Sequence, residues 1–174
     1  DSFSLKQSQF LFPKEGNITA KLNHYQAEVS KGNGHMWDIP ITMSTVGGPN
    51  DDWNTTTPSL WLTTAELTDI TLSGLTSDIP IVLNVRRMGY FLVNYDEKNW
   101  KLIGDALARN KDDIHPYNRA QILFDIQLLA KIGLVENETK SHVMSYLPEE
   151  DNEAIKEMDS NFDRIVKWYK WLSD

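Results

Sequence analysis

The sequence has 174 residues, of which 40% are hydrophobic, and a formal net charge of -8 at pH 7. This negative charge argues against a nucleic-acid partner, because phosphate binding needs clustered lysine and arginine. The sequence contains no cysteine, which excludes disulfides, thiolate zinc sites and cysteine nucleophiles in this chain.

Residues 1–95 carry the pattern of a β domain. Short runs rich in Val, Ile, Thr and aromatic residues are separated by Gly, Pro, Asn and Asp, as in strands joined by turns. In the run 37–46, apolar and polar residues alternate, which puts the apolar side chains on one face of a strand. Pro40 lacks an N–H group, so this strand is expected at an edge or a bulge. Several short strands with regular turns predict a β-sandwich. The predicted strands cover residues 4–12, 24–29, 37–46, 59–67, 70–72, 80–84 and 89–95.

The apolar spacing changes to that of helices at Asp96, which predicts a second domain over residues 96–174. The Asp96 carboxylate suits a helix N-cap. Trp100, Ile103 and Leu107 then fall on one face of the first helix.

Three further helices are predicted after the first one. Pro116 suits the first turn of a helix that is apolar on most sides and should be buried, and Gly133 suits its C-terminal end. A third helix covers about 138–147 and stops at Pro148. The last helix begins among the acids 149–151, and paired antiparallel helices of this kind predict the start of an α-solenoid. Its continuous apolar stripe is Ala154, Met158, Phe162, Ile165, Tyr169 and Leu172, broadened by Trp168 and Trp171.

Four segments resemble blocks of the zinc aminopeptidase family of the aminopeptidase N type, a gluzincin family. Residues 84–96 (NVRRMGYFLVNYD), followed by Trp100, resemble its junction motif N-x4-G-[YF]-[YF]-R-V-N-Y-D-x3-W. Residues 7–11 resemble Q-x-R-F-L, and residues 37–42 resemble W-x-[IV]-P-[IL]-T. Residues 114–125 resemble the helix I-x4-R-A-Q-[IL]-[IL]-x-D. The four blocks occur in the family's order.

The resemblance implies that the chain joins a β-sandwich to the opening helices of a helical C-terminal domain. The longer protein would be a zinc metallo-aminopeptidase that removes N-terminal residues from peptides, at the cell surface or outside the cell. Within that longer protein, this chain would contact the catalytic domain and the remaining helices. The substrates of the longer protein would be peptides. The implied role of this part is to space and cover the catalytic domain, with zinc as the cofactor of the longer protein only.

The chain itself carries no candidate catalytic residue, cofactor site or metal ligand. A zinc aminopeptidase needs His-Glu-x-x-His on a helix and a downstream glutamate ligand. The four histidines are far apart, and none has a second histidine four residues on. No Gly-x-Ser-x-Gly elbow for a serine nucleophile is present. The candidates for other roles are structural.

Two charged residues, Arg119 and Asp125, lie in the largely apolar second helix. Buried charges need partners. We interpret the two residues as bracing this helix, through ion pairs or hydrogen bonds, against the sandwich or the catalytic domain. Direct contact with substrate is the alternative.

Three N-glycosylation sequons begin at Asn17, Asn54 and Asn137. Glycans at these asparagines would place the chain in the secretory route. Together with the resemblance, they favour an extracellular or plasma-membrane ectodomain, and a cytoplasmic location is left open.

Two other functions compete with the aminopeptidase. Gln9 and Leu92 stand where the family motifs have arginine, which favours a non-catalytic receptor or scaffold relative. A free-standing protein-interaction module is the third hypothesis. It requires the apolar stripe of the last helix to be covered, because an exposed stripe of that size is unusual for a monomer. Self-association through this helix is the expected consequence, whereas packing against a following helix is the alternative.

Overall fold

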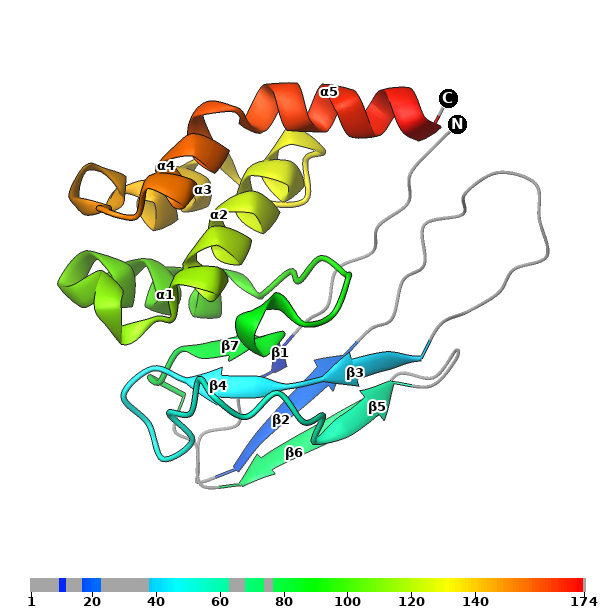
Figure 1. The fold of residues 1–174 in the computed structure, drawn as a ribbon. Helices are drawn as coiled ribbons and strands as arrows, with labels where there is room; N and C mark the ends of the chain where they lie inside the picture. Colours follow the sequence, from blue (N-terminus) through cyan, green and yellow to red (C-terminus); the bar gives the residue numbers. More distant parts are fainter. Residues whose placement is uncertain (1–9, 12–16, 23–37, 63–67, 74–76, 174) are drawn as a thin grey trace.

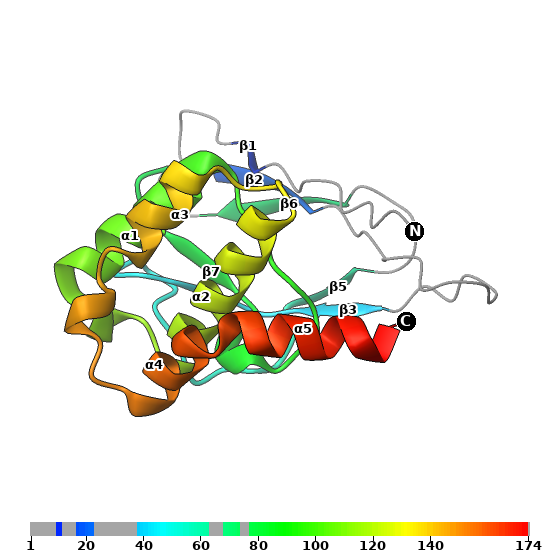
Figure 2. The same cartoon turned by 90° about the horizontal axis from the view of Figure 1, so that it is seen from above.

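The computed structural model describes residues 10–11, 17–22, 38–62, 68–73 and 77–173. Within these residues, short β-strands come first and α-helices follow, in the predicted order. Most of the regular structure is helical. Figure 1 shows the helices gathered on one side of the strands, and the view from above in Figure 2 shows α2 and α5 lying over them.

The strands form three small antiparallel sheets. The order β1-β2-β6 makes one sheet, and the pairs β3-β5 and β4-β7 make the other two. The predicted β-sandwich stays a prediction, because these sheets alone do not establish it. The strands are β1 (Phe10–Leu11), β2 (Asn17–Leu22), β3 (Ile39–Ile41), β4 (Met43–Thr45), β5 (Leu60–Leu62), β6 (Thr68–Ser73) and β7 (Ile81–Leu83).

The strand predicted over 37–46 is interrupted at Thr42, which lies between the end of β3 at Ile41 and the start of β4 at Met43. The Thr42 carbonyl accepts a hydrogen bond from the Asn84 amide, and the Thr42 hydroxyl accepts one from the Val85 amide at 2.8 Å. Pro40 lies in β3, whose hydrogen-bonded neighbour among the described residues is β5 alone. This position agrees with the edge strand that its missing N–H group requires.

The strand predicted over 89–95 is wrong, since the described residues form no strand there. The reason is that the Val93 amide donates to the Asp125 carboxylate of a helix, and not to a neighbouring strand. Strand β2 was not among the strands predicted from the sequence. The strand predicted over 24–29 lies outside the described residues.

The helices begin largely where the sequence predicts. Asp96 caps the first helix by accepting a hydrogen bond from the Asn99 amide at 2.8 Å. Pro116 opens the second helix, and Gly133 follows its end with a left-handed φ of 78°. The elements are η1 (Val85–Arg87), α1 (Glu97–Asn110), η2 (Lys111–Asp113), α2 (Pro116–Lys131), α3 (Asn137–Met144), η3 (Leu147–Glu149), α4 (Glu153–Ser160) and α5 (Phe162–Ser173).

Two helix predictions need correction. The third helix ends at Met144, and Pro148 lies in the short η3 turn that follows. The predicted last helix is divided into α4 and α5 at Asn161, which leaves the helical region with a ψ of 4°. In α4 the buried residue is Ile155, whereas Ala154 of the predicted stripe is exposed. The side chains of the stripe beyond residue 167 lie outside the described residues.

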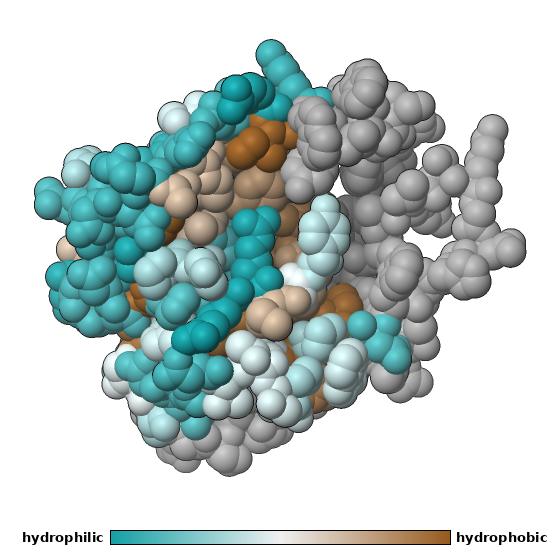
Figure 3. Space-filling view, viewed as in Figure 1, coloured by the Kyte–Doolittle hydropathy of each residue, from teal (hydrophilic) through white to brown (hydrophobic). Residues whose placement is uncertain are grey.

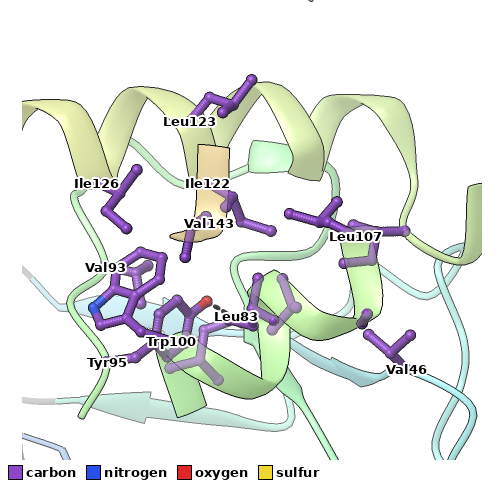
Figure 4. Close-up of a cluster of buried hydrophobic side chains, with 14 of the residues drawn as sticks. Val46, Leu83, Val93, Tyr95, Trp100, Leu107, Ile122, Leu123, Ile126 and Val143 are labelled. Atoms are coloured by element: carbon purple, nitrogen blue, oxygen red, sulfur yellow. Dashed lines mark hydrogen bonds between the residues drawn. The ribbon is translucent and has the colours of Figure 1, made fainter. Parts of the chain in front are cut away.

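The hydrophobic core spans the predicted domain boundary between residues 95 and 96. Leu83 of β7 and Tyr95 pack in one cluster with Trp100 of α1 and Ile122 of α2 (Figure 4). The Tyr95 and Trp100 rings meet edge to face with centroids 4.8 Å apart, and Trp100 is 1% exposed. The division into residues 1–95 and 96–174 stays a prediction, but any two domains here share a core.

Candidate functional site

Strand β7 is held on both edges, by a strand on one side and by side chains on the other. It pairs with β4. On the opposite edge, the Asn99 side chain of α1 accepts from the Ile81 amide at 2.9 Å and donates to the Ile81 carbonyl at 2.8 Å. The Tyr95 hydroxyl accepts from the Leu83 amide at 2.9 Å, as the dashed line in Figure 4 marks. Burial raises the pKa of Tyr95, so its hydroxyl stays neutral.

The turn after β7 has an unusual backbone. Asn84, Arg86 and Arg87 have φ values of 61°, 55° and 54°, in the left-handed region that residues with a Cβ avoid. The Asn84 side chain spans the turn, because its amide nitrogen donates to the Gly89 carbonyl and its oxygen accepts from the Gly89 amide at 2.8 Å. These bonds hold the strained backbone in place.

Asn118 of α2 fastens this turn to the helix. Its side-chain oxygen accepts from the Arg86 amide at 2.8 Å, and its nitrogen donates to the Asn84 carbonyl at 3.0 Å. The same nitrogen lies 3.2 Å from the Gln121 side-chain oxygen. Asn118 is 0% exposed. Without it the Arg86 amide would lose its partner, whereas the Asn84 carbonyl would keep the Arg87 amide, which donates to it at 2.8 Å.

Asp125 joins α2 to the segment before α1. One carboxylate oxygen accepts from the Val93 amide at 3.0 Å and from the Gln121 side chain at 3.4 Å. Burial raises the pKa of Asp125 to about 7, against the opposing effect of these hydrogen bonds and of the Arg87 charge. Through Val93, Asp125 thus contacts the far side of the predicted boundary. Whether this contact is the bracing function predicted for it stays a prediction.

Arg119 forms an ion pair with Glu150, which lies in the connection between α3 and α4. Two guanidinium nitrogens donate to the two Glu150 carboxylate oxygens at 2.8 and 3.0 Å, and the side chains are 3% and 0% exposed. Burial acts to raise the pKa of Glu150, but the hydrogen bonds and charge of Arg119 outweigh it and keep that pKa below its usual value. Arg119 also donates to the carbonyls of Lys111 and Ile114. All these partners lie within residues 96–174.

The three sequons lie in different surroundings. Asn54 is exposed in the loop after β4, where its side-chain oxygen accepts from the Arg86 guanidinium. Asn137 is exposed and is the first residue of α3. Asn17 begins β2 and pairs with Ser73 of β6, and its side chain lies outside the description.

The described residues offer no set of ligands for zinc. No group of three or more histidine, aspartate or glutamate side chains among them is placed to hold a metal ion. His115 instead caps α2 by accepting from the Tyr117 amide at 3.2 Å, and His142 of α3 lies 3.0 Å from Asp105 of α1.

Three buried amides that order the junction were not recognised from the sequence: Asn84, Asn99 and Asn118, each at most 1% exposed. Asn84 could have been found from its position directly after the apolar run 81–83, where an unpartnered amide would be costly. Asn99 and Asn118 lie among polar and charged neighbours, which give no such signal. Outside this junction, a shallow groove of about 270 Å³ is lined by Ala154, Glu157, Met158, Asn161, Arg164 and Ile165. None of the helices in the described ranges has the length and apolar character to cross a membrane.

Comparison with known proteins places the chain in a family. Residues 80–174 match the family described as the ERAP1-like C-terminal domain. The chain is 34% identical over 110 residues to membrane alanyl aminopeptidase of Heliothis virescens, covering 63% of this chain and 10% of that protein. It is 33% identical over 101 residues to aminopeptidase N of Bos taurus, covering 58% and 10%. It is 28% identical over 173 residues to the thyrotropin-releasing hormone-degrading ectoenzyme of Homo sapiens, covering 94% and 15%.

These matches define a class, the C-terminal part of aminopeptidase N-type proteins. The chain belongs to the ERAP1-like C-terminal domain family. It spans only 10% to 15% of the length of these three relatives.

Proposed function

We propose that this chain is the non-catalytic joint of a zinc metallo-aminopeptidase that removes N-terminal residues from peptides. The observation that carries the proposal is the family match over residues 80–174. Relatives with aminopeptidase names that are 33% to 34% identical to the chain support it. The joint would space the catalytic domain from the helical domain and form the base of the helical cover.

In this proposal, residues 1–95 form a β-sandwich domain and residues 96–174 form the first helices of an α-solenoid. The buried contacts across residue 95, namely Asn99 with Ile81 and Asp125 with Val93, support a rigid connection between them. A rigid joint fixes the distance and angle at which a cover stands over a catalytic site. That geometry would limit the size of the peptides that enter.

Zinc would be bound elsewhere in the longer protein, and peptides would be that protein's substrates. The catalytic domain and the remaining helices would contact this chain. We place the protein outside the cell or at the plasma membrane, since relatives carry the words "membrane" and "ectoenzyme" in their names. The exposed Asn54 and Asn137 are then candidate glycan sites, together with Asn17.

A non-catalytic receptor or scaffold relative is the second candidate. The observation in its favour is Leu92, a half-buried apolar residue where the family motif has arginine. The sequence that precedes this chain in the longer protein would discriminate, because an intact His-Glu-x-x-His favours the enzyme and a degenerate one favours the scaffold.

The native protein tests both candidates. It would be captured with an antibody raised against this chain, its mass measured before and after removal of N-glycans, and its hydrolysis of aminoacyl-arylamides assayed with and without a zinc chelator. A much larger, glycosylated protein with chelator-sensitive activity is expected. A large inactive protein would favour the scaffold. A native species of about the mass of this chain, 20.0 kDa, would contradict both and favour an interaction module that self-associates through its last helix.

A further inference from the structure

The turn between β7 and α1 exposes two large apolar residues. Met88 is 67% exposed and Tyr90 is 90% exposed, whereas Val85 at the other end of the turn is 0% exposed. Tyr117, 63% exposed, lies in the first turn of α2, which packs on η1. Figure 3 shows this side of the molecule, where hydrophobic residues lie in a hollow between the helices and the strands.

The backbone of this turn is not the one that its residues would choose. Arg86 and Arg87 adopt left-handed φ values, each of which costs on the order of 1 kcal/mol or more for a residue with a Cβ. The chain could change direction here without this strain, because a glycine at either position would adopt the same left-handed φ without a steric cost. Such outliers persist where the surrounding structure holds them, and they cluster at sites of interaction.

The surroundings of the turn hold it rigidly. Asn84 bonds both backbone groups of Gly89, and Asn118 bonds the Arg86 amide. The Arg86 guanidinium donates to the Trp53 carbonyl at 2.7 Å. A Cβ at position 89 would collide with the Phe91 ring. A binding surface that is ordered before the partner arrives loses little conformational entropy on binding.

The charges of the turn indicate the chemistry of the partner. In the part of the chain that the structure describes, neither Arg86 nor Arg87 makes an ion pair within 4.0 Å. Arg86 donates to neutral oxygens of Trp53 and Asn54, and the Arg87 guanidinium lies over the Phe124 ring, 5.1 Å from its centroid. Arginine, tyrosine and methionine are enriched in protein interfaces. Two arginines that make no ion pair within 4.0 Å among the described residues, beside exposed apolar side chains, suit an apolar pocket rimmed by carboxylates.

We propose that the surface formed by Arg86, Arg87, Met88, Tyr90 and Tyr117, here called the docking tip, binds an acidic, apolar-floored surface on the catalytic part of the same polypeptide. This inference rests on the proposed function. The catalytic part is the chosen partner because the chain spans at most 15% of the relatives named above, so most of such a protein lies outside it. The docking tip would then fix the angle between the catalytic part and the joint.

Photo-crosslinking in the full-length protein tests the docking tip. Benzoylphenylalanine would replace Met88 in one variant and Glu138, which is exposed in the first turn of α3, in the control variant. We expect position 88 to crosslink to peptides from the catalytic part that contain Asp or Glu, with at least a tenfold higher yield than position 138. Equal yields, or crosslinks from position 88 only to residues 1–174, would overturn the proposal.

A second experiment measures the mechanical consequence. The variant Met88→Ser/Tyr90→Ser of the full-length protein should be cleaved several-fold faster by a protease between the catalytic part and this chain. The control Trp61→Ser removes another exposed apolar side chain, 53% exposed on β5, and should leave that rate unchanged. An unchanged rate in the double variant would contradict the docking tip.

The two proposals fail separately. A wild-type protein with chelator-sensitive activity but no crosslink from position 88 refutes only the docking tip. An inactive protein that gives the expected crosslink refutes only the enzymatic function. A native polypeptide that begins near Asp1, with no catalytic part before it, would also overturn the docking tip.

Discussion

The Asp125 carboxylate accepts the hydrogen bond of the Val93 amide at 3.0 Å, so a helix side chain occupies the place that a neighbouring strand would otherwise take. This contact explains why residues 89–95 form no strand although their apolar and aromatic residues predict one. It also puts a carboxyl group in the core, with Tyr95 and Gln121 beside it and Arg87 near enough to lower its pKa. Its protonation therefore affects stability.

The first prediction concerns the pH dependence of that stability. The Asp125 pKa is raised to about 7 in the folded protein from its ordinary value of 3.8, which the unfolded chain keeps. Between these values the folded protein holds a proton that the unfolded chain releases, so the free energy of unfolding falls as pH rises from about 4 to about 7. At about 1.4 kcal/mol for each pKa unit, the titration of Asp125 changes the free energy of unfolding by on the order of 4 kcal/mol.

Asp125→Asn should remove this contribution, because the amide oxygen can still accept from Val93 but the side chain does not ionise. Urea unfolding at pH 5, 6, 7 and 8 would show a flatter profile for the variant, with its largest stability gain over wild type at pH 8. Parallel profiles for the two proteins would contradict the assignment.

The second prediction concerns the buried pair of Arg119 and Glu150. Arg119→Met leaves a carboxylate that is 0% exposed without its cation, and should cost about 3–5 kcal/mol of unfolding free energy. Arg119→Met combined with Glu150→Leu should cost much less than the sum of the two single changes. The matched control is Lys131→Met, which breaks an exposed pair with Asp163 and should cost less than about 1 kcal/mol. Additive single costs would mean that the pair is not coupled.

The third prediction concerns Asn118. Asn118→Ala removes the partner of the Arg86 amide, whereas the Asn84 carbonyl still accepts from the Arg87 amide. Thermal unfolding should therefore show a loss of about 1–3 kcal/mol, the cost of one buried backbone group without a partner. Asn110→Ala, at an exposed position with bonds to Asp112 and Asp113, should lose about 1 kcal/mol or less. If Asn118→Ala lowered the free energy of unfolding no more than Asn110→Ala does, the turn would not depend on the Asn118 side chain.

The fourth prediction concerns the close approach of α3 to α1. A Cβ at Gly104 would lie 2.6 Å from the His142 ring and 3.3 Å from the Val143 Cα. Gly104→Ala should destabilise the protein by about 1–2 kcal/mol, since the overlap outweighs the higher helix propensity of alanine. In a His142→Ala background, the same change should be neutral or stabilising. If Gly104→Ala costs the same in both backgrounds, the ring is not the obstacle.

The sequence alone predicted the local features well, because each depends on a few neighbouring residues. Asp96 as an N-cap, Pro116 at a helix start and the buried face of Trp100, Ile103 and Leu107 are all found. The broken last helix was missed, because its apolar stripe continues through Asn161 and gives no signal of the break. The partners of Arg119 and Asp125 could not be predicted, since Glu150 and Val93 are brought to them only by tertiary packing.

Hydrogen exchange on the native chain tests the central claim, that strand β7, the segment before α1 and helix α2 form one rigid joint. The Ile81, Leu83 and Val93 amides donate to side chains of Asn99, Tyr95 and Asp125. Opening them should therefore require the same free energy as opening the amides of Ile122 and Ile126 in the middle of α2. Equal opening free energies, close to that of global unfolding, are the predicted result. Exchange of the β7 and Val93 amides at a free energy several kcal/mol lower, with α2 still protected, would contradict the joint.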